Sequence, residues 1–220
     1  MSELNFVQAR TNMVEQQIRP WNVVDQRVLD VISLVPREAF VPEPYRNLAY
    51  AEVNIELGHG QVMMTPAIEG RLLQAARVNA DDKILEIGTG SGYFTALLAN
   101  MGGHVYSVEI FADLQRQAAR HLEEQGIDNV SLEEGDGAQG WNRYAPYDVI
   151  VVTGSLPVLP EAFQKSLAPG GRLVAIVGES PAMEARLVTR SDNGEFHNEY
   201  LFNTEIPPLL NAPRPHRFVL

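Results

Sequence analysis

Residues 83–92 read KILEIGTGSG and carry the strongest structural signal in this chain. A short apolar run, 84–87, enters a glycine-rich turn, 88–92, and the helical pattern YFTALLA follows at once. Glycines let the main chain approach a ligand closely, and the free N–H groups at the start of a helix face that ligand. The stretch therefore predicts a strand, a turn and a helix that together bind a nucleotide-containing cofactor.

Three features around this turn distinguish among such cofactors. A dinucleotide fingerprint reads GxGxxG, whereas the third glycine here, Gly92, comes one residue early. Glu86, two residues before the first glycine, would repel a pyrophosphate but suits the ammonium group of an amino acid. Glu109 ends a second apolar run roughly 20 residues past the turn, where a carboxylate can bind ribose hydroxyls. S-adenosylmethionine has a ribose, a cationic amino-acid part and no phosphate, and it fits all three features.

Composition narrows the class of protein. At 220 residues the chain is expected to form one compact domain with a substantial core. The absence of cysteine excludes disulfides, a thiol nucleophile and zinc–thiolate sites. A net charge of −11 opposes nucleic-acid binding, which depends on Lys and Arg, and we interpret the small basic cluster at 214–217 as a tail. Without a signal-peptide core or an apolar run of ~20 residues, we expect no membrane partner and a cytoplasmic location. The oligomeric state is not predicted.

Alternating strand and helix patterns predict an α/β fold with a doubly wound, Rossmann-like parallel sheet. Strands are expected at 83–88, 104–109, 129–133, 147–153 and 171–177, and helices at 91–101, 111–125 and 158–167. Residues 184–191 and 196–203 are expected to form a hairpin that closes one edge of the sheet.

An N-terminal helical extension precedes the sheet. Apolar residues recur at helical spacing from about residue 4 to 35, with a break at 19–22 caused by a proline. Residues 36–62 are predicted to be loop with short elements, and a further helix is expected to start at Thr65 and Pro66. Residues 1–80 are thus assigned to the helical extension and substrate-site segment, and 81–220 to the cofactor-binding core.

Several segments together resemble the protein-L-isoaspartate O-methyltransferase family of S-adenosylmethionine-dependent enzymes. They are ILEIGTGSGYFTALLA, VYSVEI, EGDGAQGW, APYDVIVVTGSLPVLPEAF and LAPGGRLVAIVG, and the resemblance covers roughly residues 8 to 180. It implies a Rossmann-like methyltransferase sheet, protein repair, and a protein or peptide substrate that contains isoaspartate. It also implies that the methionine part of the cofactor is bound by Glu86, Gly88, Thr89, Gly90 and Ser91, the ribose by Glu109, and the adenine by Ile110, Asp136 and Gly137. For Asp136, a plain turn acid after a strand is the alternative.

The substrate-site segment departs from the family pattern. The family reads G-Q-T-I-S-x-P, and its serine contacts the isoaspartyl end of the substrate, but this chain reads GQVMMTP at 60–66 and places Met64 there. A thioether cannot donate a hydrogen bond to a carboxylate, and losing one charge-assisted bond costs roughly 1.5–3 kcal/mol. Thr65 could stand in, although it competes as a helix N-cap, and so could Ser155, unless it is only a loop residue. The candidate catalytic residues are therefore Met64, Thr65 and Ser155, and no metal site is predicted.

Two further residues near this segment are candidates for ordering the site. Glu52 could help order a lid over the cofactor, or it could be a solvated loop acid. His59 is expected to be structural rather than catalytic.

Several functional hypotheses remain open at this level. An active methyltransferase could act on an isoaspartyl carboxylate or on a less polar acceptor suited to Met63 and Met64. A carboxylate acceptor is already ionised at pH 7, so no general base is required. The change at Met64 also allows a cofactor-binding protein without transfer activity. An NAD-dependent dehydrogenase is disfavoured by the glycine spacing and by Glu86.

Overall fold

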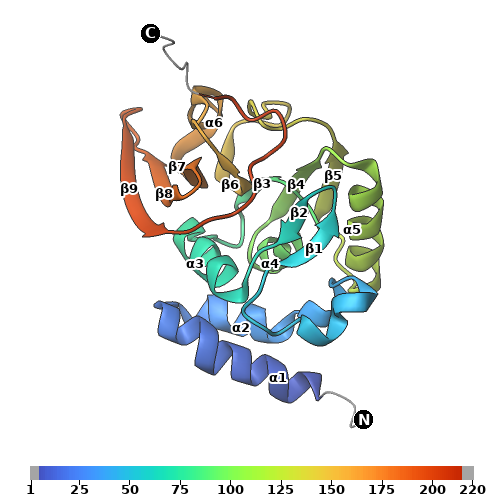
Figure 1. Cartoon of the computed structure of the whole chain (residues 1–220). Coiled ribbons are helices and arrows are strands. Elements are labelled where there is room, and N and C mark those ends of the chain that lie inside the picture. Colours follow the sequence, from blue (N-terminus) through green and yellow to red (C-terminus); the bar gives the residue numbers. More distant parts are fainter. Residues whose placement is uncertain (1–4, 215–220) are drawn as a thin grey trace.

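The structure is a computed structural model that describes residues 5–214, and its main feature is a mixed α/β sheet (Figure 1). In this part of the chain, seven strands form one sheet in the order β5-β4-β3-β6-β7-β8-β9. The strands are β3 (Lys83–Ile87), β4 (His104–Glu109), β5 (Val130–Glu134), β6 (Tyr147–Leu156), β7 (Leu167–Glu179), β8 (Ala182–Arg190) and β9 (Phe196–Asn203). Strands β3 to β7 are parallel, and β8 and β9 continue the sheet as an antiparallel hairpin. The predicted doubly wound sheet and its edge hairpin are confirmed.

Helices connect the parallel strands, as the alternating pattern predicts. They are α4 (Tyr93–Met101), α5 (Ala112–Glu124) and α6 (Glu161–Lys165). The first two match their predicted ranges closely, but the helix predicted over 158–167 is only five residues long. It starts after Pro160, because a proline disfavours helical geometry at the residue before it. Strand β7 then begins at Leu167, earlier than predicted, and its register with β6 is irregular near that end.

The core occupies both faces of the sheet. Successive side chains of a strand point to opposite faces. Ile84 and Val149 therefore pack with the N-terminal helices, α3 and α4, whereas Leu85 and Ile150 pack on the other face with Phe163 of α6. All five side chains are fully buried. Burial on both faces explains why the central strands read as continuous apolar runs.

The N-terminal extension is mainly helical, and its first two helices lie at the base of the molecule in Figure 1. It comprises α1 (Phe6–Met13), the π-helical turn η1 (Val14–Ile18), the 3-10 turn η2 (Arg19–Trp21), α2 (Gln26–Leu34) and, later in the chain, α3 (Pro66–Ala76). The predicted break at 19–22 is confirmed, and Asn22 ends the turn in the left-handed region at φ 67°. Within residues 5–214, no helix has both the length and the apolar character needed to cross a membrane.

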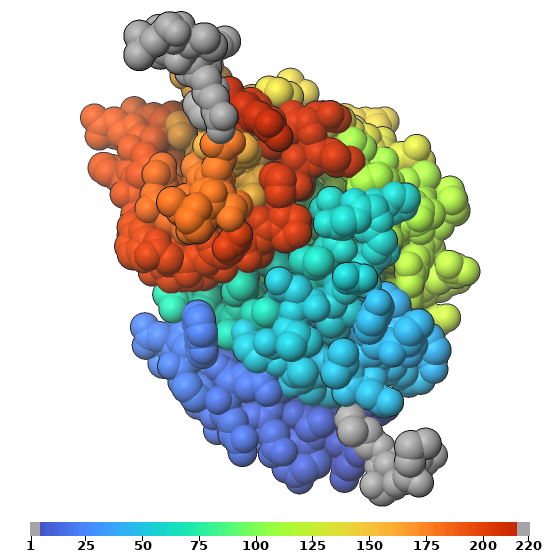
Figure 2. Space-filling view, viewed as in Figure 1, coloured from blue at the N-terminus to red at the C-terminus, as the bar shows by residue number. Residues whose placement is uncertain are grey.

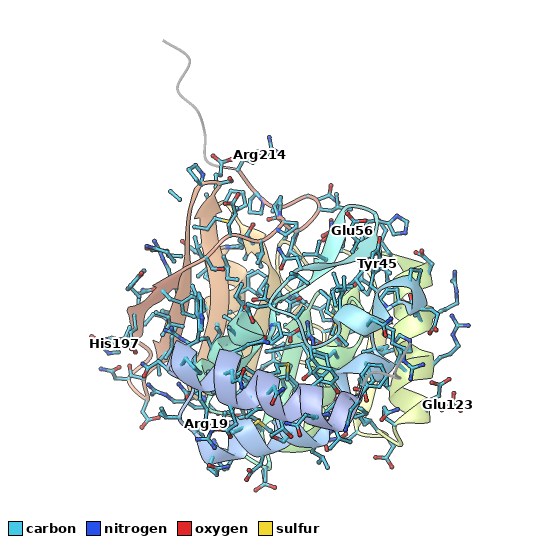
Figure 3. The ribbon with its side chains drawn as sticks, turned by 60° about the horizontal axis from the view of Figure 1, so that its bottom comes forward. Arg19, Tyr45, Glu56, Glu123, His197 and Arg214 are labelled. Atoms are coloured by element: carbon cyan, nitrogen blue, oxygen red, sulfur yellow. The ribbon has the colours of Figure 1, made fainter. Side chains whose placement is uncertain are left out.

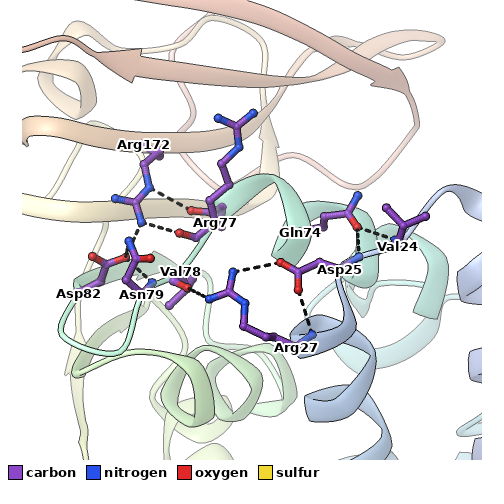
Figure 4. Close-up of polar contacts among 10 residues, drawn as sticks. Val24, Asp25, Arg27, Gln74, Arg77, Val78, Asn79, Asp82 and Arg172 are labelled. Carbon is purple, nitrogen blue, oxygen red and sulfur yellow. Dashed lines mark hydrogen bonds and ion pairs between the residues drawn. The ribbon is translucent and has the colours of Figure 1, made fainter.

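Polar contacts attach the N-terminal helices to α3 and α3 to the sheet (Figure 4). The side-chain oxygen of Gln74 in α3 accepts hydrogen bonds from the main-chain N–H groups of Val24 and Asp25, at 2.7 and 2.9 Å. On β7, Arg172 donates to the main-chain oxygen of Arg77 at 2.7 Å. Because the last carbonyls of a helix lack partners within the helix, this arginine closes the C-terminal end of α3.

Residues 36–62 are loop with short elements, in agreement with the prediction. They form the short 3-10 turns η3 (Arg37–Ala39) and η4 (Glu43–Leu48), and a hairpin of β1 (Ile55–Gly58) and β2 (Gln61–Met63). The hairpin lies outside the main sheet. Tyr45 of η4 donates a hydrogen bond to Glu56 of β1 at 3.5 Å, and the two side chains lie near each other in Figure 3.

After β9 the chain crosses back over the molecule toward β6 (Figure 1). Pro208 forms an isolated parallel bridge with Ser155 near the end of β6. In the space-filling view this red segment meets the cyan β1–β2 hairpin (Figure 2). The two segments, far apart in sequence, thus meet over the same part of the sheet.

Candidate functional site

A cavity of about 690 Å³, part of it open to solvent, lies at the carboxyl ends of β3, β4 and β6. The strand order reverses at this point, because β4 and β5 follow on one side of β3 and β6 and β7 on the other. Open α/β sheets bind ligands at such a switch point. The sheet contributes Ile87, Gly88, Gly90, Val108, Glu109, Ile110, Asp136, Gly137 and Thr153 to the lining. The β1–β2 hairpin and the segment after β9 cover it with Leu57, Gln61, Val62, Ile206, Pro207, Leu209 and Leu210.

The glycine turn after β3 has a backbone that needs glycine. Gly88, Gly90 and Gly92 have φ of 101°, 54° and 85°, all in the left-handed region. A Cβ on Gly88 would collide with the hydroxyl of Thr153, which already donates to the Gly88 carbonyl at 2.6 Å. A Cβ on Gly90 would come 3.1 Å from Leu57 of the hairpin. Glycine is therefore favoured by the left-handed backbone and by the close approach of Thr153 and Leu57 to this turn.

The carboxylate of Glu109 lies beside this turn and is 5% exposed. Its Oε2 accepts a hydrogen bond from the main-chain N–H of Gly90 at 2.9 Å, and its Oε1 accepts one from Phe111 at 3.1 Å. Each carboxylate oxygen can accept more than one hydrogen bond. Glu109 is thus oriented by the main chain and retains capacity for ligand hydroxyls.

Glu86, by contrast, does not line the cavity. It is fully buried on β3, where its Oε2 accepts hydrogen bonds from the hydroxyls of Thr95 and Ser107. Burial raises its pKa to about 8, and these two hydrogen bonds act in the opposite direction. Thr89 is also turned inward and shares a 2.6 Å hydrogen bond with Ser107. The structure thus places the Glu86 side chain outside the lining of the cavity.

Apolar side chains and a glycine also line the cavity. Ile110, Phe111 and Leu114 line one side of it, and Asp136 and Gly137 follow β5. A Cβ on Gly137 would come 2.8 Å from Ile87, so the close packing needs glycine there. Asp136 accepts a hydrogen bond from Ala138 N at 3.0 Å and another from the Asn211 side chain at 2.9 Å. It therefore shapes its own turn and also holds the segment that follows β9.

A second, smaller cavity of about 300 Å³ adjoins the first and shares six of its lining residues: Leu57, Val62, Met64, Gly88, Gly90 and Thr153. Met63, Glu69, Thr89, Ser91 and Phe94 complete its wall. Met64 faces both cavities and is 4% exposed. The structure thus brings Met64 next to the glycine turn.

The two hydroxyls expected to compensate for Met64 line neither of these cavities. Thr65 precedes α3 as predicted for an N-cap, although its side chain makes no capping hydrogen bond. Ser155 is fully buried, and its hydroxyl donates to the main-chain oxygen of Ile206 at 3.1 Å. Its main-chain N–H and C=O pair with Pro207 and Leu209 at 3.0 Å. Ser155 is therefore used to hold the segment after β9, and it is not available to an acceptor.

Glu52 has a definite structural partner. Its Oε2 accepts a hydrogen bond from Ala67 N at 3.2 Å, in the first turn of α3. A carboxylate at that position satisfies a free N–H group and interacts favourably with the helix dipole. It takes over the capping that Thr65 does not provide, and it contributes to neither cavity.

His59 fixes the tip of the β1–β2 hairpin, in agreement with a structural role. Its ring stacks on Phe111 with 4.0 Å between centroids and 10° between planes. Its Nε2 lies 2.9 Å from Asp113 on α5, and this contact lowers the pKa of the Asp113 carboxyl. Phe111 lines the cavity itself. The hairpin is thus held over the carboxyl end of β4.

Sequence reasoning missed two sets of lining residues. The hairpin residue Leu57 and the segment 206–210, which reads IPPLL, belong neither to the glycine motif nor to the substrate-site segment 60–66. The sequence of 206–210 is apolar and contains proline, but this composition does not predict which part of the chain the segment packs against. In residues 5–214, no group of three acidic or histidine side chains is placed to hold a metal ion.

Comparisons with known proteins agree with the resemblance. The family model described as protein-L-isoaspartate(D-aspartate) O-methyltransferase matches residues 8–212. A protein-L-isoaspartate O-methyltransferase of Gloeobacter violaceus is 40% identical over 205 residues, which are 93% of this chain and 100% of that relative. One of Rhodopseudomonas palustris is 42% identical over 201 residues, 91% of this chain and 92% of that relative.

Solved structures show the same fold. A protein-L-isoaspartate O-methyltransferase superposes with a TM-score of 0.78 at 25% identity, covering 90% of this chain and 65% of that one. A structure from Plasmodium falciparum assigned to the same family, solved in complex with S-adenosyl-L-homocysteine, gives a TM-score of 0.76 at 19% identity, covering 94% and 99%. Since the family model spans nearly the whole chain and relatives at 40% identity match most of it, this chain belongs to the protein-L-isoaspartate O-methyltransferase family.

Proposed function

We propose that this enzyme transfers a methyl group from S-adenosylmethionine to the free carboxylate of L-isoaspartyl residues in damaged proteins. The observation that carries the proposal is one continuous space that joins the glycine turn, Glu109 and the pair Asp136–Gly137 to Met64 of the substrate-site segment. Relatives at about 40% identity over nearly their full length bear the same activity in their names.

The side chains and main-chain groups that line the cavity suit the chemistry of S-adenosylmethionine. Glu109 would hold the ribose hydroxyls, and Ile110, Asp136 and Gly137 would enclose the adenine. The turn 88–91 would hold the methionine part, since it lines the smaller cavity next to Met64.

The cofactor supplies a methyl group on a sulfonium, and the chain supplies position and exclusion of water. An isoaspartyl carboxylate is ionised at pH 7 and attacks without a general base. Proximity and alignment then account for the acceleration. The β1–β2 hairpin and residues 206–210 cover the cavity, so they would keep water from the reacting groups.

A second candidate acceptor is favoured by the apolar wall of the smaller cavity. Leu57, Val62, Met63, Met64 and Phe94 all contribute to it. Ser91 lines it too, and its hydroxyl accepts a hydrogen bond from Tyr93 N at 3.3 Å while its own hydrogen has no acceptor among the described residues. An acceptor less polar than a carboxylate would suit the apolar part of this wall, whereas Glu69 contributes a carboxyl group to it.

The test is transfer of labelled methyl from S-adenosylmethionine to an isoaspartyl peptide and to the matched aspartyl peptide. Selective labelling of the isoaspartyl peptide that is lost in mild base supports the proposal. Absence of labelling, with cofactor binding confirmed by calorimetry, would contradict the isoaspartyl acceptor and direct the search to less polar acceptors in cell extracts.

A further inference from the structure

A buried carboxylate that belongs to no sequence motif lies in the smaller cavity. Glu69, in the first turn of α3, is 3% exposed and shares this cavity with residues 88–91 of the glycine turn. Its Oε2 forms an ion pair with Arg37. Within residues 5–214, no donor forms a hydrogen bond with the other oxygen, Oε1. Oε1 is also not one of the polar atoms that are both buried from solvent and without a hydrogen-bond partner, so it is accessible from the cavity. Glu69 therefore keeps one acceptor oxygen for a ligand.

Arg37 fixes the orientation of this carboxylate. It is fully buried, and it donates to the main-chain oxygen of Ala49 at 2.8 Å and to that of Met64 at 2.6 Å. Its guanidinium also lies 4.8 Å from the ring centroid of Tyr93. With these contacts and the ion pair to Glu69, the guanidinium is held in place and is not free to bind an anionic ligand.

The charge of the smaller cavity indicates the kind of ligand group. Glu69 is a wall residue, and no Lys, Arg or His side chain among the described residues lines this cavity. Burial raises the pKa of Glu69 to about 8, and the guanidinium of Arg37 opposes that rise. A second cation at Oε1 would further favour the ionised carboxylate. The cavity is therefore suited to a cationic hydrogen-bond donor.

We propose that Oε1 of Glu69 accepts a charge-assisted hydrogen bond from the ammonium group of the cofactor's amino-acid part, with Arg37 as its positioning residue. The inference rests on the proposed use of S-adenosylmethionine and assigns the ammonium to Glu69 instead of Glu86. The reason is position: Glu86 is sealed beneath the turn, whereas Glu69 lines the cavity that the turn also lines. Such bonds are stronger than neutral ones, and exclusion of water strengthens them further.

The test compares Glu69→Gln with the wild type for two ligands by calorimetry. S-adenosylhomocysteine carries the amino-acid part, and 5′-methylthioadenosine keeps the adenosine and the thioether but lacks the amino acid. We expect a loss of about 10- to 100-fold in affinity for S-adenosylhomocysteine and no change for 5′-methylthioadenosine. Unchanged affinity for S-adenosylhomocysteine would overturn the inference, and an equal loss for both ligands would assign Glu69 a purely structural role.

Two controls keep the outcomes distinguishable. If Glu69→Gln does not fold because Arg37 is left buried without its partner, the double variant Arg37→Met with Glu69→Met removes the pair together and should show the same ligand-selective loss. Glu56→Gln, on the exposed side of β1, should bind both ligands as the wild type does. If the wild type binds neither ligand, the proposed cofactor itself fails; if it binds both and Glu69→Gln changes nothing, only the role of Glu69 fails.

Discussion

The main-chain N–H of Gly90 donates a 2.9 Å hydrogen bond to the carboxylate of Glu109. This contact joins the turn after β3 to the end of β4, two points 19 residues apart in the chain. The parallel pairing of Ile87 with Val108 brings both to the same edge of the sheet. The ligand site is thus assembled by strand pairing, and each partner helps to fix the geometry of the other.

Replacing Glu109 tests the ribose site. Glu109→Ala removes the acceptor for two ribose hydroxyls and for Gly90, so affinity for S-adenosylhomocysteine should fall about 100-fold, equivalent to two hydrogen bonds of ~1.5 kcal/mol each. Isothermal titration calorimetry measures the change. Glu134→Ala is the matched control, because Glu134 pairs with Glu109 in register on β5 but is exposed. Unchanged affinity in Glu109→Ala would contradict the assignment of S-adenosylmethionine as the cofactor.

Met64→Ser tests whether the missing hydroxyl limits transfer. A serine can donate a hydrogen bond to the acceptor carboxylate, so kcat/KM on an isoaspartyl peptide should rise about 10- to 100-fold. The hydrogen bond from Arg37 to residue 64 uses the main-chain oxygen and is unaffected by the change. Met64→Ala creates similar space without a hydroxyl and should show no such gain. An equal effect of both variants would mean that space, rather than a donor, is limiting.

Arg37→Leu tests the buried ion pair. The change leaves the Glu69 carboxylate and the carbonyls of Ala49 and Met64 without their donor, and breaking a buried pair costs about 3–5 kcal/mol. Urea denaturation should show this loss in the free energy of unfolding. Lys165→Ala, which breaks an exposed pair with Glu161, should produce no measurable change. A similarly small effect in Arg37→Leu would show that the pair is dispensable for the fold.

The raised pKa of Glu86 predicts that the free energy of unfolding depends on pH. Its pKa is raised from 4.5 to about 8 by burial, so the folded protein holds a proton that the unfolded chain releases above pH 4.5. This contribution to stability is complete below pH 4.5 and is lost as pH rises toward 8. The free energy of unfolding of the wild type should therefore fall between pH 5 and 8, and Glu86→Gln should fall less steeply. Glu69 titrates in both proteins and cancels in the comparison. Parallel curves for the two proteins would contradict the burial effect.

The sequence by itself determined the parts of the fold that depend on local signals. These local signals are the apolar run 84–87, the glycines at 88, 90 and 92, and the acid at 109. They can be interpreted from the sequence because strand period, left-handed φ and helix N-termini are properties of neighbouring residues. The sheet, its edge hairpin and the break at 19–22 followed from such signals. Family membership rests on the same motifs, now matched over residues 8–212. The roles of the individual cofactor-binding residues stay predictions.

Only the tertiary structure decided which side chains share the cavity. The hairpin residue Leu57, the segment 206–210 and Glu69 come from three distant parts of the chain, and no local pattern specifies that they meet. Ser155 looked available in sequence, but its hydroxyl is used by Ile206. Glu86 was predicted to bind the methionine part of the cofactor, and in the folded chain its side chain is fully buried and lines neither cavity. Burial and long-range hydrogen bonding depend on how the whole chain packs, so they could be read only from the folded molecule.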